Sequence, residues 1–540
     1  ATELPEVTVE ASKEKLPGER LYPDEGYQSR GATVGSRTET DLKDIPQSIS
    51  VINNELLRDV PVARINQLAD YVAGVEPFAS AATPYTNAFF FRGFGSTSAT
   101  TFNGFRDSGF LTSQSLINLD RIEFLKGPAS VLYGGSAGLS GLVNYVSKQP
   151  QATPFNEITV GGGSFDRQYT TLDSTGALNE DGSLRYRLTA SYDKGGNHKD
   201  KYSQDSTFIS PYLSWDIGDK TKLDVELIAQ DTSFDGRENF LPRHPVSFRL
   251  PVETNLGIGG TGNDKKRVAR VDFKHQFDNG ITFRQGLYVS KVDKFDDFSF
   301  QFLGVNPDGE TGRRRVRSVP ESERDWTSQS ELNGVFSTGV LKHELLIGME
   351  LRKRKFDYDF FVATANDVDL FNPQKGIQTG PLNGSGEKSG ASSRAFYVQD
   401  LIDLTHDFKL MLGGRFDEVS QFSRARNAVA APGRDTKEHA FSPRVALIYQ
   451  PTPATSNYCS YSESFSPQLG LSRTNDQFEP QEGEQYEVGV KHDLRPDLSL
   501  SMSVFEFTRK NALTSDPVDP LFSIAVGEQR SRGFELELNG

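Results

Sequence analysis

The stretch DRIEFLKGPASVLYGGSAGLSGLVNYVSKQP, residues 120–150, marks the boundary between two architectures. Residues 121–124 predict a short strand that runs into Lys126-Gly127-Pro128, and residues 129–133 predict a helical turn. The glycines that follow, at positions 134, 135, 138 and 141, allow the backbone to turn sharply with positive φ. Residues 142–146 predict a closing strand. Before this stretch the sequence pattern indicates both helices and strands, whereas nearly every segment after it indicates a long strand.

The segment before this boundary, residues 38–150, has the size of one small domain. Asn54 is placed to cap a helix through residues 55–57. Residues 89–91 predict a strand that ends at the Arg92-Gly93 turn. A second helical segment is indicated by apolar residues at helical spacing, namely Ile65, Leu68, Ala69 and Val72. Helices and strands therefore alternate here, which predicts a mixed α/β domain.

Beyond Pro154 the apolar period becomes two, as in residues 184–192 and 498–504. Strands of ten or more residues with one apolar and one polar face are typical of a membrane barrel, whereas the strands of a soluble sandwich usually have about five or six residues. Short turns at 179–182, 218–220, 278–280 and 495–497 alternate with long loops near 194–205, 233–265, 295–323, 358–392, 420–437, 465–481 and 509–523. This alternation favours a barrel of about sixteen strands.

Composition excludes several classes of protein. A formal charge of −14 argues against a nucleic-acid partner, which would favour a basic face. The single cysteine, Cys459, rules out an internal disulfide, and the seven histidines show no metal-ligand spacing. The serine, histidine and aspartate residues do not occur in a sequence pattern typical of a catalytic triad. No glycine-rich stretch has the flanking sequence of a phosphate-binding loop. We therefore expect neither an enzyme nor a metal site. Ala1 is interpreted as a mature N-terminus left after signal-peptide cleavage.

The boundary stretch also resembles the closing segment of the plug domain in TonB-dependent outer-membrane receptors, specifically the ferric-siderophore branch. Further segments carry the same resemblance in the family's order: DIPQSISVI (44–52), LADYVAGV (68–75), FFFRGFGS (89–96), EQYEVGVK (484–491) and RSRGFELE (530–537). Each motif is weak alone, but the ordered set spans the chain from end to end.

The resemblance implies an N-terminal mixed α/β plug inside a transmembrane antiparallel β-barrel of about 22 strands. It divides the chain into a flexible N-terminal segment (1–35), a plug (36–153) and a barrel (154–540). Because only about sixteen strands are counted, and the chain ends at Asn539-Gly540 rather than at an aromatic residue, we expect the barrel to lack about six C-terminal strands. The strands near 157–163 and 530–539 should then each have one open edge.

The function implied by the resemblance is that of an outer-membrane receptor in a Gram-negative cell. It would bind a ferric siderophore, as transported ligand and not as cofactor, and import it with energy supplied by TonB together with ExbB and ExbD. Outer-membrane lipid and lipopolysaccharide are further expected partners, and the arginines of the 295–323 loop could attract their phosphates; a solvated loop tip is the preferred interpretation of that loop. The alternatives are a receptor for cobalamin, haem or another large nutrient, or a passive porin, which would not explain residues 38–150.

Three groups of site residues follow from the resemblance. The TonB box, an extended segment that pairs with TonB by strand addition, is assigned to Pro5, Glu6, Val7, Thr8, Val9, Glu10 and Ala11. Ligand contacts at the plug apex are assigned to Tyr85, Arg106 and Phe110, because a bulky chelate is held by aromatic faces and a few donors. A plug–barrel lock is assigned to Arg92, Lys126, Glu487 and Glu535. Alternation turns the two glutamates into the lumen, where unpaired charge is costly.

Overall fold

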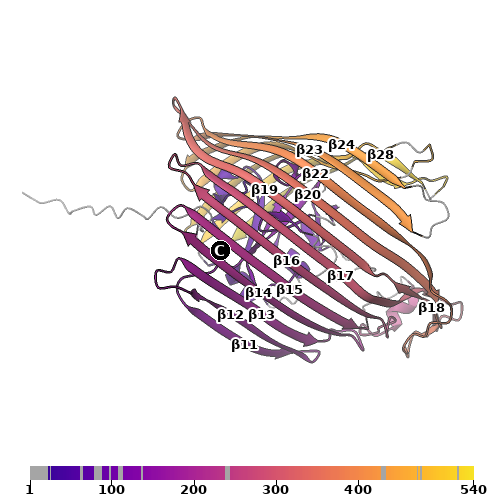
Figure 1. Cartoon of the computed structure of the whole chain (residues 1–540). Helices are drawn as coiled ribbons and strands as arrows, with labels where there is room; N and C mark the ends of the chain where they lie inside the picture. The colour runs from indigo at the N-terminus through magenta and orange to yellow at the C-terminus, as the bar shows by residue number, and fades with distance from the viewer. Residues whose placement is uncertain are drawn as a thin grey trace, which may run out of the picture.

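An N-terminal domain lies within the curve of one large antiparallel sheet (Figure 1). The structure is a computed structural model. It describes residues 22, 24, 26–60, 65–77, 88–96, 99–107, 114–135, 138–236, 244–426, 433–470, 472–474, 477–519 and 522–540. None of the helices in these ranges is long and apolar enough to cross a membrane.

The N-terminal domain is built on a five-stranded sheet in the order β3-β9-β10-β7-β8. Its strands are β3 (Ile49–Asn53), β7 (Thr100–Phe102), β8 (Phe105–Arg106), β9 (Leu119–Lys126) and β10 (Gly141–Ser147). Around it lie β1 (Gly31–Ala32), β2 (Thr40–Asp41), η1 (Leu42–Asp44), α1 (Asn54–Asp59), η2 (Ile65–Tyr71), β4 (Val75–Pro77), β5 (Phe89–Phe91), β6 (Phe94–Ser96) and α2 (Ser130–Tyr133). The strand, turn and strand predicted within residues 120–150 are thus β9, α2 and β10.

The large sheet follows chain order, with every strand antiparallel to its neighbours. Its strands are β11 (Phe155–Gly163), β12 (Arg167–Ala177), β13 (Leu184–Gly195), β14 (Ser203–Ile217), β15 (Thr221–Asp235), β16 (Thr261–Gln276), β17 (Thr282–Val305), β18 (Thr311–Ser318), β19 (Glu321–Thr338), β20 (Leu341–Thr364), β21 (Val368–Asp369), β22 (Asn383–Asp403), β23 (Phe408–Arg426), β24 (Arg434–Thr452), β25 (Thr455–Ser466), β26 (Gln481–Arg495), β27 (Leu498–Ser515) and β28 (Ser523–Asn539). The four short turns predicted from the sequence all join neighbouring strands of this sheet.

The large sheet has 18 strands, and the expected count of about sixteen is reached when two short strands are left out. β18 and β21 belong to the long connections, since β17 also pairs directly with β19, and β20 with β22. Sixteen strands then form the wall. Within the described residues β11 pairs only with β12 and β28 only with β27, so each has one open edge.

Alternation along the wall separates an exposed face from a face that covers the N-terminal domain. On β26, Tyr486 and Val488 are 56% and 61% exposed, whereas Glu487 between them is 2% exposed. On β28, Phe534 and Leu536 are exposed and Glu535 is buried. A period of two along an extended chain produces this arrangement, and it leaves large apolar side chains on the outer surface of the sheet.

The structure shortens several of the predicted long loops, since β23 continues to Arg426, β24 begins at Arg434 and β27 continues to Ser515, and two loops change most. Residues 295–323 and 358–392 were expected to be loops, but β17 and β20 continue as strands to Val305 and Thr364. The cause is local pairing, because β18 bonds to both of these strands. The preferred interpretation of a solvated basic tip also fails for Arg314, which is 4% exposed. Its guanidinium donates to the backbone oxygens of Asn366 and Gln374.

Two further corrections concern the N-terminal domain. The cap of α1 is Asn53, not Asn54: the Asn53 side chain accepts a hydrogen bond from the Leu56 N–H at 3.1 Å. The flexible segment predicted for residues 1–35 does not extend to its last residues, since Ala32 and Val34 are fully buried. The pairing of β1 with β2 accounts for that order.

Candidate functional site

Arg92 stands at the tip of a tight hairpin. β5 and β6 are joined by Arg92 and Gly93, whose φ angles are 52° and 85°. Two successive residues of positive φ give a type I′ turn, which matches the twist of a two-residue hairpin. A non-glycine residue in this region is strained by about 1–3 kcal/mol. Contacts of the Arg92 side chain therefore have to compensate for that cost.

The Arg92 guanidinium bridges two carboxylates on the inner face of the large sheet. Its Nη1 lies 2.7 Å from Glu487 Oε2, and its Nη2 lies 2.8 Å from Glu535 Oε2. The guanidinium also lies over the Phe505 ring, 3.8 Å from the centroid, as a cation–π contact. Burial acts to lower the pKa of Arg92, but the carboxylates of Glu487 and Glu535 raise it above its ordinary value. The group is therefore a permanent cation.

Lys126 extends the same cluster along β28. Its Nζ lies 3.7 Å from Glu535 Oε2 and 2.7 Å from Glu537 Oε1. Glu537 also accepts hydrogen bonds from the Ser50 hydroxyl (2.7 Å) and the Ala73 N–H (2.9 Å). Sequence reasoning missed Glu537, although it lies two residues beyond Glu535 and so faces the same side of the strand.

Glycines bring the N-terminal domain close enough for these contacts. A Cβ at Gly74 would lie 2.1 Å from Glu535 Oε1, and a Cβ at Gly127 would lie 2.2 Å from the Gln485 side-chain nitrogen. Both glycines have positive φ, 71° and 100°. A larger residue would therefore meet steric conflict with the wall as well as backbone strain.

The cations of this cluster come from one side of the contact only. Within the described residues, the ion-pair partners of Glu487 and Glu535 are Arg92 and Lys126, both in the N-terminal domain. The hydrogen-bond donors that the described part of the wall offers to Glu487 are neutral: the hydroxyl of Tyr458 (2.6 Å) and the amide of Gln485 (3.2 Å). Removing one partner of a buried ion pair costs about 3–5 kcal/mol. The four residues predicted as a plug–barrel lock are thus brought together, with Glu537 as a fifth member.

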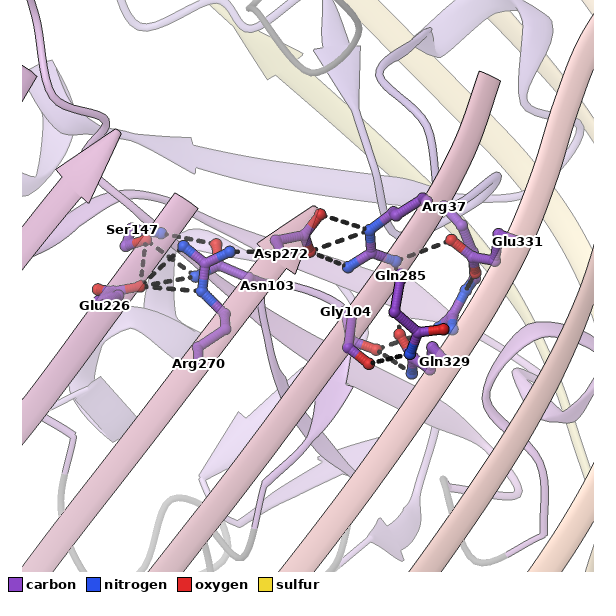
Figure 2. A network of polar contacts seen from close by, with 12 residues as sticks. Arg37, Asn103, Gly104, Ser147, Glu226, Arg270, Asp272, Gln285, Gln329 and Glu331 are labelled. Atoms are coloured by element: carbon purple, nitrogen blue, oxygen red, sulfur yellow. Dashed lines mark hydrogen bonds and ion pairs between the residues drawn. The ribbon is translucent and has the colours of Figure 1, made fainter. Parts of the chain in front are cut away.

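A second polar contact lies on another part of the wall (Figure 2). Arg37 Nε lies 2.6 Å from Glu331 Oε1, and Arg37 Nη1 donates to the Gly104 carbonyl at 3.1 Å. Further along, the Ser147 hydroxyl donates to Glu226 Oε2 at 3.1 Å. Nothing in the sequence pattern singles out Arg37, because it lies in a polar segment with no periodicity.

A third contact lies directly after β8. Asp107 is fully buried at the side chain, with Oδ2 2.5 Å from Lys266 Nζ on β16. Its other oxygen, Oδ1, accepts a hydrogen bond from the Tyr288 hydroxyl on β17 at 2.7 Å. Here the charge pattern is reversed, because the domain supplies the acid and the wall supplies the cation.

The predicted ligand contacts are only partly placed. Tyr85 and Phe110 lie outside the described residues, as does the whole TonB box, Pro5 to Ala11. Arg106 lies within the described residues, but it is only 7% exposed, so its side chain is not open to a ligand. Its Nη1 donates to the Gly135 carbonyl at 2.5 Å. Across the part of the chain that the structure describes, no group of three or more His, Cys, Asp or Glu residues could hold a metal ion.

A plug-like domain fixed by buried ion pairs to the inner wall of a large antiparallel barrel defines a class, the plugged receptors of outer membranes. Family models bear this out. Residues 41–139 match the TonB-dependent receptor plug domain, and residues 214–540 match the TonB dependent receptor-like β-barrel. The chain belongs to the TonB-dependent receptor family. We refer to the N-terminal domain below as the plug.

Two relatives illustrate the similarity in sequence. The metal-pseudopaline receptor CntO of Pseudomonas aeruginosa (strain UCBPP-PA14) is 30% identical over 558 residues, covering 100% of this chain and 77% of the relative. The ferrichrome outer membrane transporter/phage receptor of Escherichia coli (strain K12) is 28% identical, covering 99% of this chain and 77% of the relative. Members of this family are transport receptors of Gram-negative outer membranes.

Solved structures show the same fold at lower identity. The ferric-catecholate import receptor Fiu of Escherichia coli K12, in its closed form, superposes with a TM-score of 0.85 at 19% identity, covering 96% of this chain and 80% of Fiu. The siderophore receptor PiuA of Acinetobacter baumannii gives 0.83 at 22% identity, with 93% and 77% covered. The plug and barrel arrangement is therefore that of known receptors.

Replacing Glu487 by Gln should weaken retention of the plug. The substitution removes one of the two carboxylates that hold Arg92, and loss of a hydrogen bond to a charged group costs about 1.5–3 kcal/mol. Trypsin cleavage after the buried Lys126 reports opening of the plug, so the variant should be cut at a lower urea concentration. Glu528→Gln, at an exposed position on the same barrel edge, serves as the control. An unchanged urea threshold for Glu487→Gln would contradict the assignment.

Proposed function

We propose that the protein binds a ferric siderophore outside the cell and imports it across the Gram-negative outer membrane, as a receptor and not as an enzyme. The observation that carries this proposal is the plug held by buried ion pairs in the barrel. A passive porin would need no such domain. Family membership and the relatives, among them ferrichrome and ferrioxamine B receptors, support the siderophore as cargo.

Energy for import would come from TonB, acting with ExbB and ExbD. The outer membrane holds no proton gradient of its own, so a force transmitted from the inner membrane has to move the plug. We assign the contact to residues 5–11, whose backbone would add a strand to TonB. In the same proposal residues 1–35 carry this segment, residues 36–153 are the plug, and residues 154–540 form the barrel wall.

The ligand would bind where the outer end of the plug meets the upper wall. Tyr85 and Phe110 are proposed to offer aromatic faces to the chelate, in keeping with the apolar character of ligand sites. Arg106 is proposed to support this site from beneath, since it is buried and donates to the Gly135 carbonyl.

A second candidate cargo is a chelate of another metal. The relative that is 30% identical over the whole chain is a metal-pseudopaline receptor, a name that is not restricted to iron. Uptake of radiolabelled metal by a receptor-null strain carrying the complete gene distinguishes the two. Ferric siderophores should restore uptake, and an energy uncoupler should abolish it. Uptake that persists with the uncoupler would indicate a porin, and uptake of other metal chelates alone would favour the second candidate.

In the same strain, Val7→Pro should abolish uptake while leaving ligand binding unchanged. Proline removes a backbone donor and fixes φ, so the segment could not pair as a strand with TonB. Val7→Ala keeps both the donor and the backbone freedom and is the matched control. The assignment of the TonB box is wrong if the Val7→Pro receptor imports at the normal rate.

We also propose that lipopolysaccharide binds to the outer face of the barrel. A pocket of about 390 Å³ crosses β20, β22, β23 and β24, lined in part by Lys353, Lys355 and Lys437. All three lysines are exposed. Nearer to the short turns, Phe396, Phe416 and Phe441 are 56%, 50% and 64% exposed. Cations that lie just beyond an apolar band suit the phosphates of a glycolipid.

The triple variant Lys353→Ala/Lys355→Ala/Lys437→Ala should therefore copurify with less lipopolysaccharide. Phosphate per receptor, measured after detergent extraction, should fall by at least about half, since three of the cationic contacts are lost. The control is Lys220→Ala/Lys342→Ala/Arg495→Ala, which removes three exposed cations at the short turns. An equal fall in both triple variants would show that the pocket is not a specific site.

A further inference from the structure

Two tyrosines on the inner face of the wall lie flat across glycines of a neighbouring strand. Tyr397 on β22 stands directly opposite Gly348 on β20, and a Cβ at that glycine would lie 2.1 Å from the ring. Tyr458 on β25 stands directly opposite Gly489 on β26, where a Cβ would lie 2.4 Å from the ring. Neither glycine has a positive φ. The rings, and not the backbone, therefore require glycine at these two positions.

The Tyr458 hydroxyl holds the carboxylate that binds Arg92. It donates to Glu487 Oε1 at 2.6 Å, and Arg92 Nη1 lies 2.7 Å from the other oxygen, Oε2. The backbone N–H of Ser48 in the plug also donates to Oε1, at 2.7 Å. A hydrogen bond from a hydroxyl to an ionised carboxylate is among the strong ones in proteins. Tyr458 thus fixes the rotation of the carboxylate so that Oε2 faces Arg92.

The Tyr397 ring spans three strands to reach its carboxylate. Gly348 on β20 stands directly opposite both Glu331 on β19 and Tyr397 on β22, so the three residues form one row across the wall. The ring passes over Gly348, and its hydroxyl donates to Glu331 Oε1 at 2.5 Å. Arg37 Nη2 donates to the same hydroxyl at 3.1 Å, and Arg37 Nε binds Glu331 Oε1 (Figure 2). A larger residue in the middle of the row would separate the hydroxyl from the carboxylate.

Other rings in the wall lie over glycines in the same way. Phe505 on β27 stands directly opposite Gly533 on β28, and the Arg92 guanidinium lies 3.8 Å from the centre of the Phe505 ring. Phe234 on β15 covers Gly262 on β16, but as a phenylalanine it has no hydroxyl to offer a carboxylate. The pairing of a ring with a glycine is therefore a packing device of the sheet. The hydroxyl is what links it to the ion pairs of the plug.

We propose that Tyr397 and Tyr458 are positioning residues of the plug–barrel contact, which orient the wall carboxylates toward the plug arginines, and that Gly348 and Gly489 are required because they give the rings room. A glutamate side chain loses rotamer freedom when it pairs, and a hydroxyl that already fixes the carboxylate reduces that cost for the arginine. Both tyrosines stay with the wall when the plug moves, so the carboxylates remain in place for its return. That use in repeated import rests on the function proposed above.

Urea-dependent trypsin cleavage after Lys126 of the purified, ligand-free receptor tests the positioning without TonB or any siderophore, so a failure of the import proposal would not affect it. Tyr458→Phe keeps the ring on its glycine and removes only the hydroxyl. The equilibrium constant of plug opening should rise about tenfold or more, as expected for the loss of a hydrogen bond to a charged group. Gly489→Ala should raise the constant at least as much, because the new Cβ displaces the ring.

A second background separates positioning from packing. If the Tyr458 hydroxyl acts through Glu487, Tyr458→Phe should change the opening constant by less than about twofold once Glu487→Met has removed the carboxylate. The alternative is a direct effect on the plug through the Ser48 hydroxyl, which lies 3.4 Å from the Tyr458 hydroxyl. An equally large effect in both backgrounds would favour that alternative and overturn the proposal. An unchanged opening constant for Tyr458→Phe alone would also overturn it.

Two controls are matched to these variants. Gly262→Ala displaces a ring that has no hydroxyl, and Tyr186→Phe removes a wall hydroxyl whose partner is the Ser174 hydroxyl at 3.0 Å. Both should leave the opening constant within about twofold of the parent value, because neither change alters a carboxylate that binds the plug. A rise in Gly262→Ala equal to that in Gly489→Ala would show that ring packing alone decides the result, against the proposal.

Cleavage after Arg37 tests the second tyrosine. The Arg37 side chain is 2% exposed, so trypsin cuts there only after Arg37 has left Glu331. Tyr397→Phe should raise the opening constant measured at this site about tenfold or more, again because a hydrogen bond to a charged group is lost. A constant equal to that of the parent would contradict the positioning role of Tyr397.

Discussion

The structure depends on buried carboxylates of the barrel wall whose cations are supplied by a separate domain. Glu487 and Glu535 lie on the inner face of β26 and β28, and the described residues within ion-pair distance of them are Arg92 and Lys126. Without the plug, neither carboxylate would keep an ion-pair partner among the described residues. The wall thus favours a lumen occupied by the plug. The two glycines Gly74 and Gly127 follow from the same requirement, since a side chain at either position would push the domain away from the wall.

Much of this arrangement could be predicted from the sequence because it depends on one simple periodicity and on local turn signals. Alternation along residues 486–490 and 534–538 is enough to turn Glu487 and Glu535 inward and the apolar residues outward. The boundary stretch 120–150 likewise contains its own strand, turn and strand signals. Turn residues between strands are local features, so the short connections were also predicted correctly. The identity of the cations, in contrast, came from resemblance to the receptor family and not from periodicity.

The remaining contacts could not be predicted, because they depend on which segments meet in space. Arg37 lies in a polar stretch without periodicity, and its partner Glu331 is 294 residues away. Arg314 looked like one of several solvated arginines, until the pairing of β18 with β17 and β20 placed it against residues 366–374. Arg106 was expected to face a ligand, but β8 pairs with β7 and its side chain is buried. In each case a tertiary contact that the sequence pattern does not indicate decided the outcome.

The most direct measurement is a double-mutant cycle between Arg92 and its two carboxylates. It compares the parent receptor, Arg92→Met, Glu487→Gln/Glu535→Gln and the triple variant, with the free energy of plug opening taken from urea-dependent trypsin cleavage. We predict a coupling energy of at least about 1.5 kcal/mol, with the triple variant more stable than Arg92→Met alone, because neutral glutamines remove the stranded charge. Additive effects, with a coupling energy below about 0.5 kcal/mol, would contradict the claim that these ion pairs hold the plug in the barrel.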